Sequence, residues 1–151
     1  MGDTIEIKVV GLKELEQDLL ELPDRIAGRV LQSALTSAAL PIVTEARTKV
    51  PLAHGAYRLY GGGKADPGWL RDRIVRKKVK GGGNSAKVIV TIKDRRQSYF
   101  WKFIEFGTSK MAAHPFMRPA FEAKVAEAVD RFSDRLKAGI ASAVTKLKFT
   151  P

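Results

Sequence analysis

An apolar residue returns every three or four positions through the last third of the chain, and this regularity restricts the fold more than any other feature. Such spacing places the apolar side chains on one face of an α-helix, with charged residues on the opposite side. Pro119 stands at a suitable first helical position, so the pattern predicts one long C-terminal helix. The stripe consists of Phe121, Val125, Val129, Phe132, Leu136, Ile140, Val144 and Leu147.

A second long helix is predicted over residues 24–50. Apolar residues recur at every fourth position of this segment, and Asp24 is a favourable N-cap residue. Many of the central residues are alanines, which allow another backbone to approach closely. Pro41 lies inside the pattern, where a proline costs about 3 kcal/mol, so we expect a kink or a break near Leu40.

The pattern also predicts β-strands, one before the first long helix and the others between the two long helices. Apolar and polar residues alternate in Thr4–Val10, Leu70–Lys80 and Lys87–Lys93, and the aromatic-rich segment Tyr99–Phe106 is predicted as a further strand. The glycine-rich segment Gly81–Ser85 is typical of a hairpin connection. The prediction is therefore an α+β fold, in which a three- to four-stranded, mainly antiparallel sheet is packed by a long helix from the N-terminal half and a long C-terminal helix.

The length of 151 residues suits one domain spanning residues 1–151. Glycine clusters predict mobile loops at about residues 51–68 and 81–85. No apolar run approaches the roughly 18–20 residues that span a bilayer, and the first residues lack the features of a secretory signal. The expectation is a soluble protein with no membrane contact.

The residues offer little for catalysis, metal binding or cofactor binding. The sequence has no cysteine, which excludes disulfides and thiolate chemistry. His54 and His114 lie in predicted loops without the spacing of metal ligands. Gly61–Lys64 does not form a phosphate-binding loop, because Arg58 and Ala65 stand where that motif needs glycine and a hydroxyl residue. No catalytic residue, cofactor or metal site is predicted.

Glu105 is an acidic residue among aromatic ones, directly before Gly107 and Thr108. A catalytic acid needs a partner, and no carboxylate or histidine lies nearby in the sequence. We expect its carboxylate to accept hydrogen bonds from the following loop or to pair with Arg118. A hydrolase built on Glu105 and His114 is the weakest of the functions considered.

Charge is distributed unevenly along the chain. The net charge is +11, yet residues 1–24 carry −5 and residues 69–102 carry +9. Three interpretations of the basic segment stay open: contact with nucleic-acid phosphates, a solvated strand edge that prevents aggregation, or contact with an acidic neighbouring subunit through residues 1–24. No motif for reading a base sequence is present. The basic residues concerned are Arg71, Arg73, Arg76, Lys77, Lys78 and Lys80.

Several segments resemble a family of tailed-phage proteins, the head–tail connector, neck or tail-completion proteins of siphophages and prophages. The resemblance covers nearly the whole chain in the expected order, and the stretch from Glu105 to Ala120 is its most specific part. The segments are Val10–Leu15, Ala46–Pro51, Gly68–Ile74, Phe103–Met111 and His114–Phe121.

The resemblance implies an α+β structural protein of the virion without enzymatic activity or cofactor. Its subunits would form a hexameric or twelvefold ring between the head-connector or head-closure protein and the tail terminator or tail tube, with a nonspecific contact to packaged DNA. It would reside in the virion neck and, during assembly, in the host cytoplasm. The alternative is a small nonspecific DNA-binding protein that uses residues 71–96. The residues implied in assembly or structure are Glu105, Gly107, Thr108, Pro115, Phe116, Arg118 and Pro119.

Overall fold

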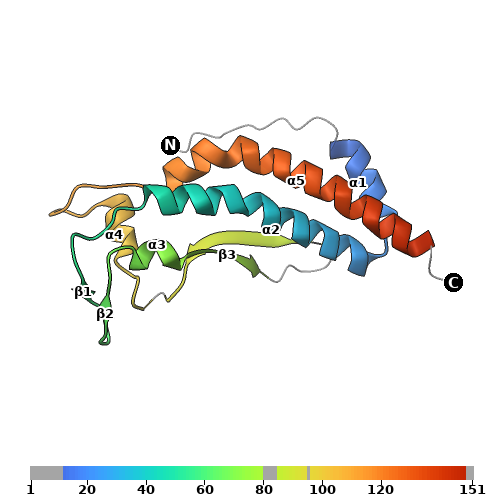
Figure 1. Cartoon of the computed structure of the whole chain (residues 1–151). Coiled ribbons are helices and arrows are strands. Elements are labelled where there is room, and N and C mark those ends of the chain that lie inside the picture. The colour runs from blue at the N-terminus through green and yellow to red at the C-terminus, as the bar shows by residue number, and fades with distance from the viewer. Residues whose placement is uncertain (1–11, 80–84, 95, 149–151) are drawn as a thin grey trace. The chain divides into compact units, whose positions relative to one another are not determined.

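The computed structural model describes residues 12–79, 85–94 and 96–148. It confirms the α+β fold class and both long helices (Figure 1). The predicted strand Thr4–Val10, Lys80 and most of the loop 81–85 lie outside the described residues. In chain order the elements are α1 (Leu12–Leu20), α2 (Asp24–Lys49), β1 (Tyr57–Arg58), β2 (Lys64–Ala65), α3 (Trp69–Arg73), β3 (Ile74–Val79), β4 (Lys87–Ile92), α4 (Trp101–Phe106) and α5 (Met117–Lys148).

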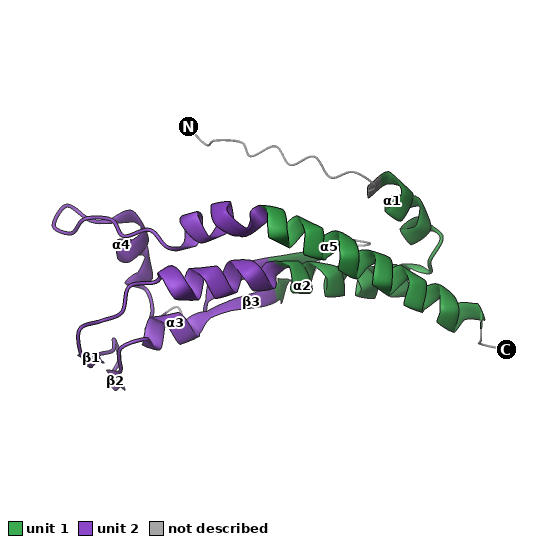
Figure 2. Cartoon of the chain, turned by 45° about the horizontal axis from the view of Figure 1, so that its top comes forward, with its two compact units in different colours: residues 1–38, 78–88, 126–151 green, residues 39–77, 89–125 purple. Residues whose placement is uncertain are grey.

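The chain divides into two compact units (Figure 2). The first unit comprises residues 1–38, 78–88 and 126–151, and the second comprises residues 39–77 and 89–125. Both long helices contribute to both units. The predicted apolar stripes therefore serve two separate cores.

In the first unit, α1 packs with the beginning of α2 and the end of α5. The two long helices approach closely at Gly139, where a Cβ atom would lie only 2.7 Å from Cγ1 of Val30. Gln32 also donates a hydrogen bond to the carbonyl of Lys87 at 3.3 Å, which ties α2 to the start of β4. The buried core consists of Leu15, Leu22, Ala34, Leu136, Ile140 and Ala143.

In the second unit, the end of α2 packs against α3, the strands and the beginning of α5. Arg47 of α2 donates two hydrogen bonds to the carbonyl of Ile74, from Nε at 3.1 Å and from Nη2 at 2.8 Å. Phe116 and Ile74 have no exposed surface. The buried core consists of Val43, Ala46, Val50, Leu70, Ile74, Ile92, Phe116 and Ala120.

The sheets are smaller than predicted. The described residues hold two two-stranded antiparallel sheets, β1 with β2 and β3 with β4, in place of one sheet of three or four strands. The basic strand begins at Ile74, because Trp69–Arg73 forms the helix α3. The prediction of a strand at Tyr99–Phe106 was wrong, because residues 101–106 form the helix α4. There Phe100 and Ile104, one helical turn apart, both pack on the second core.

Pro41 does not break α2, which runs continuously from Asp24 to Lys49. The proline removes one backbone N–H donor. Apolar burial on both sides of it, at Ala38 and Val43, offsets that loss.

By length and composition, α2 is also the one described helix that could cross a membrane, with a segment of mean hydropathy 1.3. The expectation that no segment approaches that size was therefore wrong. Ala34 of α2 lies in the first core and Ala46 in the second, so part of its apolar surface is used for packing within the chain.

Candidate interaction site

The buried carboxylate of Glu105 holds the N-terminus of α5. Its Oε2 accepts hydrogen bonds from the backbone N–H groups of Phe116 at 2.7 Å and Met117 at 2.9 Å, and its Oε1 accepts one from the N–H of Arg118 at 3.0 Å. The first N–H groups of a helix have no partner within the helix, and the positive end of the helix dipole favours an anion there. The carboxylate of Glu105, which is only 5% exposed, thus provides both the hydrogen-bond acceptor and the negative charge. Its contact with Arg118 is through the backbone N–H of Arg118.

The segment between α4 and α5 folds back on itself. Gly107 has φ 72°, and a Cβ atom there would lie 2.9 Å from the backbone nitrogen of Ala113 and from the carbonyl oxygen of Met111. Thr108 and Met111 exchange backbone hydrogen bonds, and the N–H of His114 donates to the carbonyl of Ile104 at 2.7 Å. Only glycine suits position 107, because both its conformation and its surroundings exclude a side chain.

Two further residues implied by the resemblance, Pro115 and Pro119, lie at the same junction between α4 and α5. Pro115 precedes the fully buried Phe116, which anchors the segment in the second core. Pro119 lies in the first turn of α5, where its missing N–H costs nothing. These residues position the backbone at the start of α5.

Glu105 and His114 do not form a hydrolytic pair. The oxygens of Glu105 are occupied by three backbone donors, whereas the His114 residue is exposed. No group of three or more metal-ligating side chains is found among the residues that the structure describes.

An aromatic cluster in the second unit was not predicted. Tyr99 is at its centre, with ring centroids 5.9 Å from Tyr60, 5.9 Å from Phe103 and 6.3 Å from Phe100. Phe100 in turn lies 5.7 Å from Tyr57 and 6.4 Å from Trp69. The aromatic cluster is therefore Tyr57, Tyr60, Trp69, Tyr99, Phe100 and Phe103.

Most of these rings line a cavity of about 560 Å³, here called the aromatic cavity. Its polar lining includes His54, Arg58 and Gln97, and none of the described residues that line it is acidic. Burial raises the pKa of the Tyr57 hydroxyl above its ordinary value of 10.0. The aliphatic lining residues are Leu52, Leu59, Leu70 and Ile104.

The turn before Tyr99 is held by a buried hydroxyl. Ser98 has no exposed surface, and its Oγ lies 2.7 Å from the carbonyl oxygen of Lys93 and 2.9 Å from that of Asp94. Asp94 has φ 56°, a conformation that aspartate adopts more readily than most residues. This turn directs the chain from β4 into the aromatic cluster.

The described members of the predicted basic set lie on two elements, α3 and β3. Arg71 and Arg73 lie on α3, where Arg71 pairs with Asp72 and Arg73 pairs with Asp94, each at 3.3 Å. The guanidinium of Arg73 also lies 4.8 Å from the centre of the Trp69 ring, a favourable cation–π arrangement.

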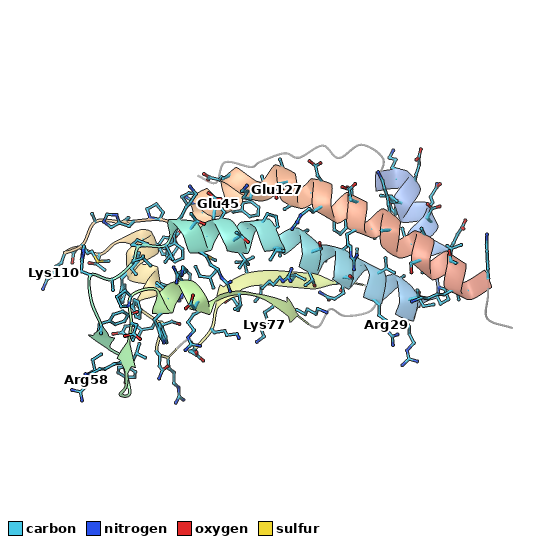
Figure 3. The ribbon with its side chains drawn as sticks, in the orientation of Figure 1. Arg29, Glu45, Arg58, Lys77, Lys110 and Glu127 are labelled. Atoms are coloured by element: carbon cyan, nitrogen blue, oxygen red, sulfur yellow. The ribbon has the colours of Figure 1, made fainter. Side chains whose placement is uncertain are left out.

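The strand β3 carries the other described members of the basic set. Arg76, Lys77 and Lys78 are exposed, and Lys80 lies outside the described residues. Figure 3 labels Lys77 on this strand and Arg58 on β1. The exposed cations thus occur on β3 and beside the aromatic cavity.

A family model described as "Bacteriophage HK97-gp10, putative tail-component" matches residues 13–107, more than half of the chain. The matched range includes α1 from Lys13 onward, the aromatic cluster and Glu105. A comparison with curated proteins and one with solved structures found no significant match.

Proposed function

Because the chain belongs to the HK97-gp10-like family of phage tail components, we propose that it is a neck or tail-completion subunit that forms a ring and joins the head to the tail. Its partners are other copies of itself, the head-connector or head-closure protein, and the tail terminator or tail tube. It acts in the virion after assembly in the host cytoplasm. A hexameric or twelvefold ring fits this role.

The observation that carries this proposal is the aromatic surface of the second unit. Tyr60, Tyr99 and Phe103 are exposed although they pack against one another. Contiguous exposed apolar groups mark protein-binding surfaces, and tyrosine and tryptophan are frequent among residues that dominate binding energy.

A phage that lacks this gene tests the role. We expect its infected cells to accumulate separate filled heads and separate tails, visible by negative-stain electron microscopy, and we expect the wild-type chain supplied from a plasmid to restore joined, infectious particles that contain it. Joined particles in the absence of the chain would overturn the proposal.

The alternative function is nonspecific DNA binding through residues 71–96, favoured by the exposed cations of β3. Against it, Arg71 and Arg73 already have acidic partners. If DNA binding is the main function, Lys77→Glu with Lys78→Glu weakens gel-shift binding and lowers its salt slope by about 0.9 per lost phosphate contact.

Arg131→Glu with Lys137→Glu on α5 makes the same change in net charge at exposed positions and serves as the matched control. If the chain is a ring subunit, it joins heads to tails whether or not it binds DNA measurably. A β3 variant whose DNA binding is weakened, yet which still joins particles as well as the control does, would therefore reject the alternative.

A further inference from the structure

Among the described residues, the lining of the aromatic cavity carries a cationic but no acidic side chain. Arg58 lines the cavity, and Lys64 is the residue opposite it in the β1–β2 pair. Both are exposed. A partner that fills the cavity must therefore bring an apolar side chain together with acidic ones.

The helix α1 has this chemistry. Its exposed residues include Glu14, Glu16 and Asp18. Leu15 is buried in the core of the first unit, whereas Leu20 is 76% exposed, the largest exposure among the large apolar side chains of the described residues.

The spacing on α1 puts acid and leucine on one face. Glu16 precedes Leu20 by four residues, so the two side chains are neighbours on the helix surface. Leu15 holds α1 on its own unit while Leu20 and Glu16 face outward together. The helix thus presents one apolar side chain beside a carboxylate. This pair complements an apolar cavity that is lined by Arg58 and has Lys64 opposite Arg58 in the β1–β2 pair.

We propose that the aromatic cavity binds α1 of a second copy of this chain, with Leu20 in the cavity and the acidic residues of α1 against Arg58 and Lys64. The proposal rests on the proposed ring and names the contact that builds it. Two different surfaces of the same chain meet, which is a heterologous contact, and repetition of such a contact closes a ring when the rotation is suitable.

The walls of the cavity favour a protein side chain over a nucleobase. A single-stranded nucleic acid needs flat aromatic faces and cations, whereas this cavity is also walled by Leu52, Leu59 and Leu70. Neighbouring rings in the cluster meet mostly edge to face, at 76° to 89°. Branched aliphatic groups suit such a surface better than a stacked base does.

Cysteine cross-linking tests the contact directly, because the natural chain has no cysteine. A chain with Leu20→Cys is mixed with a chain carrying Tyr60→Cys, both at exposed positions, and oxidised in solution and in assembled particles. Mixing two single-cysteine chains reports only contacts between copies. We expect a disulfide-linked pair at about tenfold the yield of the control pair, Leu20→Cys with Phe121→Cys, in which Phe121 is also exposed. Equal yields from the two pairs would overturn the proposal.

A charge exchange identifies the partner of α1. We expect Glu14→Lys with Glu16→Lys to block ring formation, and Arg58→Glu with Lys64→Glu to block it as well. The chain that carries all four changes recovers assembly. If Lys77→Glu with Lys78→Glu rescues the α1 variant instead, the partner is β3 and the proposal is wrong.

The remaining outcomes distinguish failure of the contact from failure of the proposed function. If particles need the chain but show no Leu20–Tyr60 cross-link, the proposed function stands and the contact fails. If heads and tails join without the chain, the proposed function fails first. If an oligothymidine strand binds and Tyr60→Ala abolishes that binding while the cross-link is absent, the cavity is a nucleic-acid site and the proposal is overturned.

Discussion

The carboxylate of Glu105 and the backbone N–H of Phe116 are 2.7 Å apart, the shortest of three bonds that one side chain makes to the start of α5. The residue before this helix is thereby fixed to the last turn of α4. The start of α5 is therefore held in two ways, by hydrogen bonds to the Glu105 carboxylate and by packing of the buried Phe116 ring in the second core. The positions of both helices in the second unit depend on this junction.

Replacing Glu105 tests that dependence. Glu105→Ala leaves buried N–H donors without an acceptor, which typically costs about 1–3 kcal/mol. The melting temperature should fall by about 2–4 °C per kcal/mol lost. Glu122→Ala removes an exposed carboxylate from α5 and should change the melting temperature little. If Glu105→Ala has the same melting temperature as the wild type, the three hydrogen bonds make no net contribution to stability.

Gly107 should tolerate no side chain. Gly107→Ala forces a methyl group to within 2.9 Å of backbone atoms at a φ of 72°, and its unfolding free energy should fall by more than about 1 kcal/mol. Gly55→Ala, where nothing lies within 4 Å, is the control. Urea unfolding of the two variants gives the comparison, and equal midpoints would contradict the described geometry.

Two glycines inside long helices should respond with opposite sign. Gly28→Ala on α2 meets nothing within 4 Å and should stabilise the protein by about 0.5–1 kcal/mol through helix propensity. Gly139→Ala on α5 places a methyl group 2.7 Å from Val30 Cγ1 and should destabilise the first unit by about 1–3 kcal/mol through overpacking. Thermal melts by far-ultraviolet circular dichroism report both, and stabilisation by Gly139→Ala would show that the helices can separate without cost.

Burial of Tyr57 should make stability depend on alkaline pH. The raised pKa means that the folded protein keeps the phenolic proton at a pH where the unfolded chain has lost it. The contribution is therefore fully present below pH 10.0 and is lost as pH rises from there through the folded pKa. Tyr57→Phe should show a smaller loss of stability above that pH than wild type, measured by urea unfolding at a series of pH values. Parallel pH curves for the two proteins would rule out the shift.

The long helices were predictable because their patterns repeat over many turns. The stripe from Phe121 to Leu147 admits no strand, and α2 begins at the predicted Asp24. The six residues of α4 are too few for a period to be recognised, and aromatic residues are typical of strands. Composition therefore favoured the wrong element.

The candidate site shows the same limit. Glu105 stood out in the sequence as an acid among aromatics, and its expected acceptor role matched the kind of bonds found, but its partners at the start of α5 follow only from the fold. The aromatic cavity joins residues from separate segments, such as Tyr60 and Tyr99, which no local pattern connects. The pairs Tyr99–Phe103 and Phe100–Ile104, each four residues apart, were the one signal that favoured a helix there.

The aromatic cluster has a spectroscopic consequence. Both tryptophans, Trp69 and Trp101, and all three tyrosines belong to the second unit. Tyrosine and tryptophan fluorescence therefore originates in that unit alone, while the far-ultraviolet circular dichroism of the helices comes from both units. Coincident transitions by the two probes mean that the units unfold as one cooperative body, and separated transitions give the order in which they come apart.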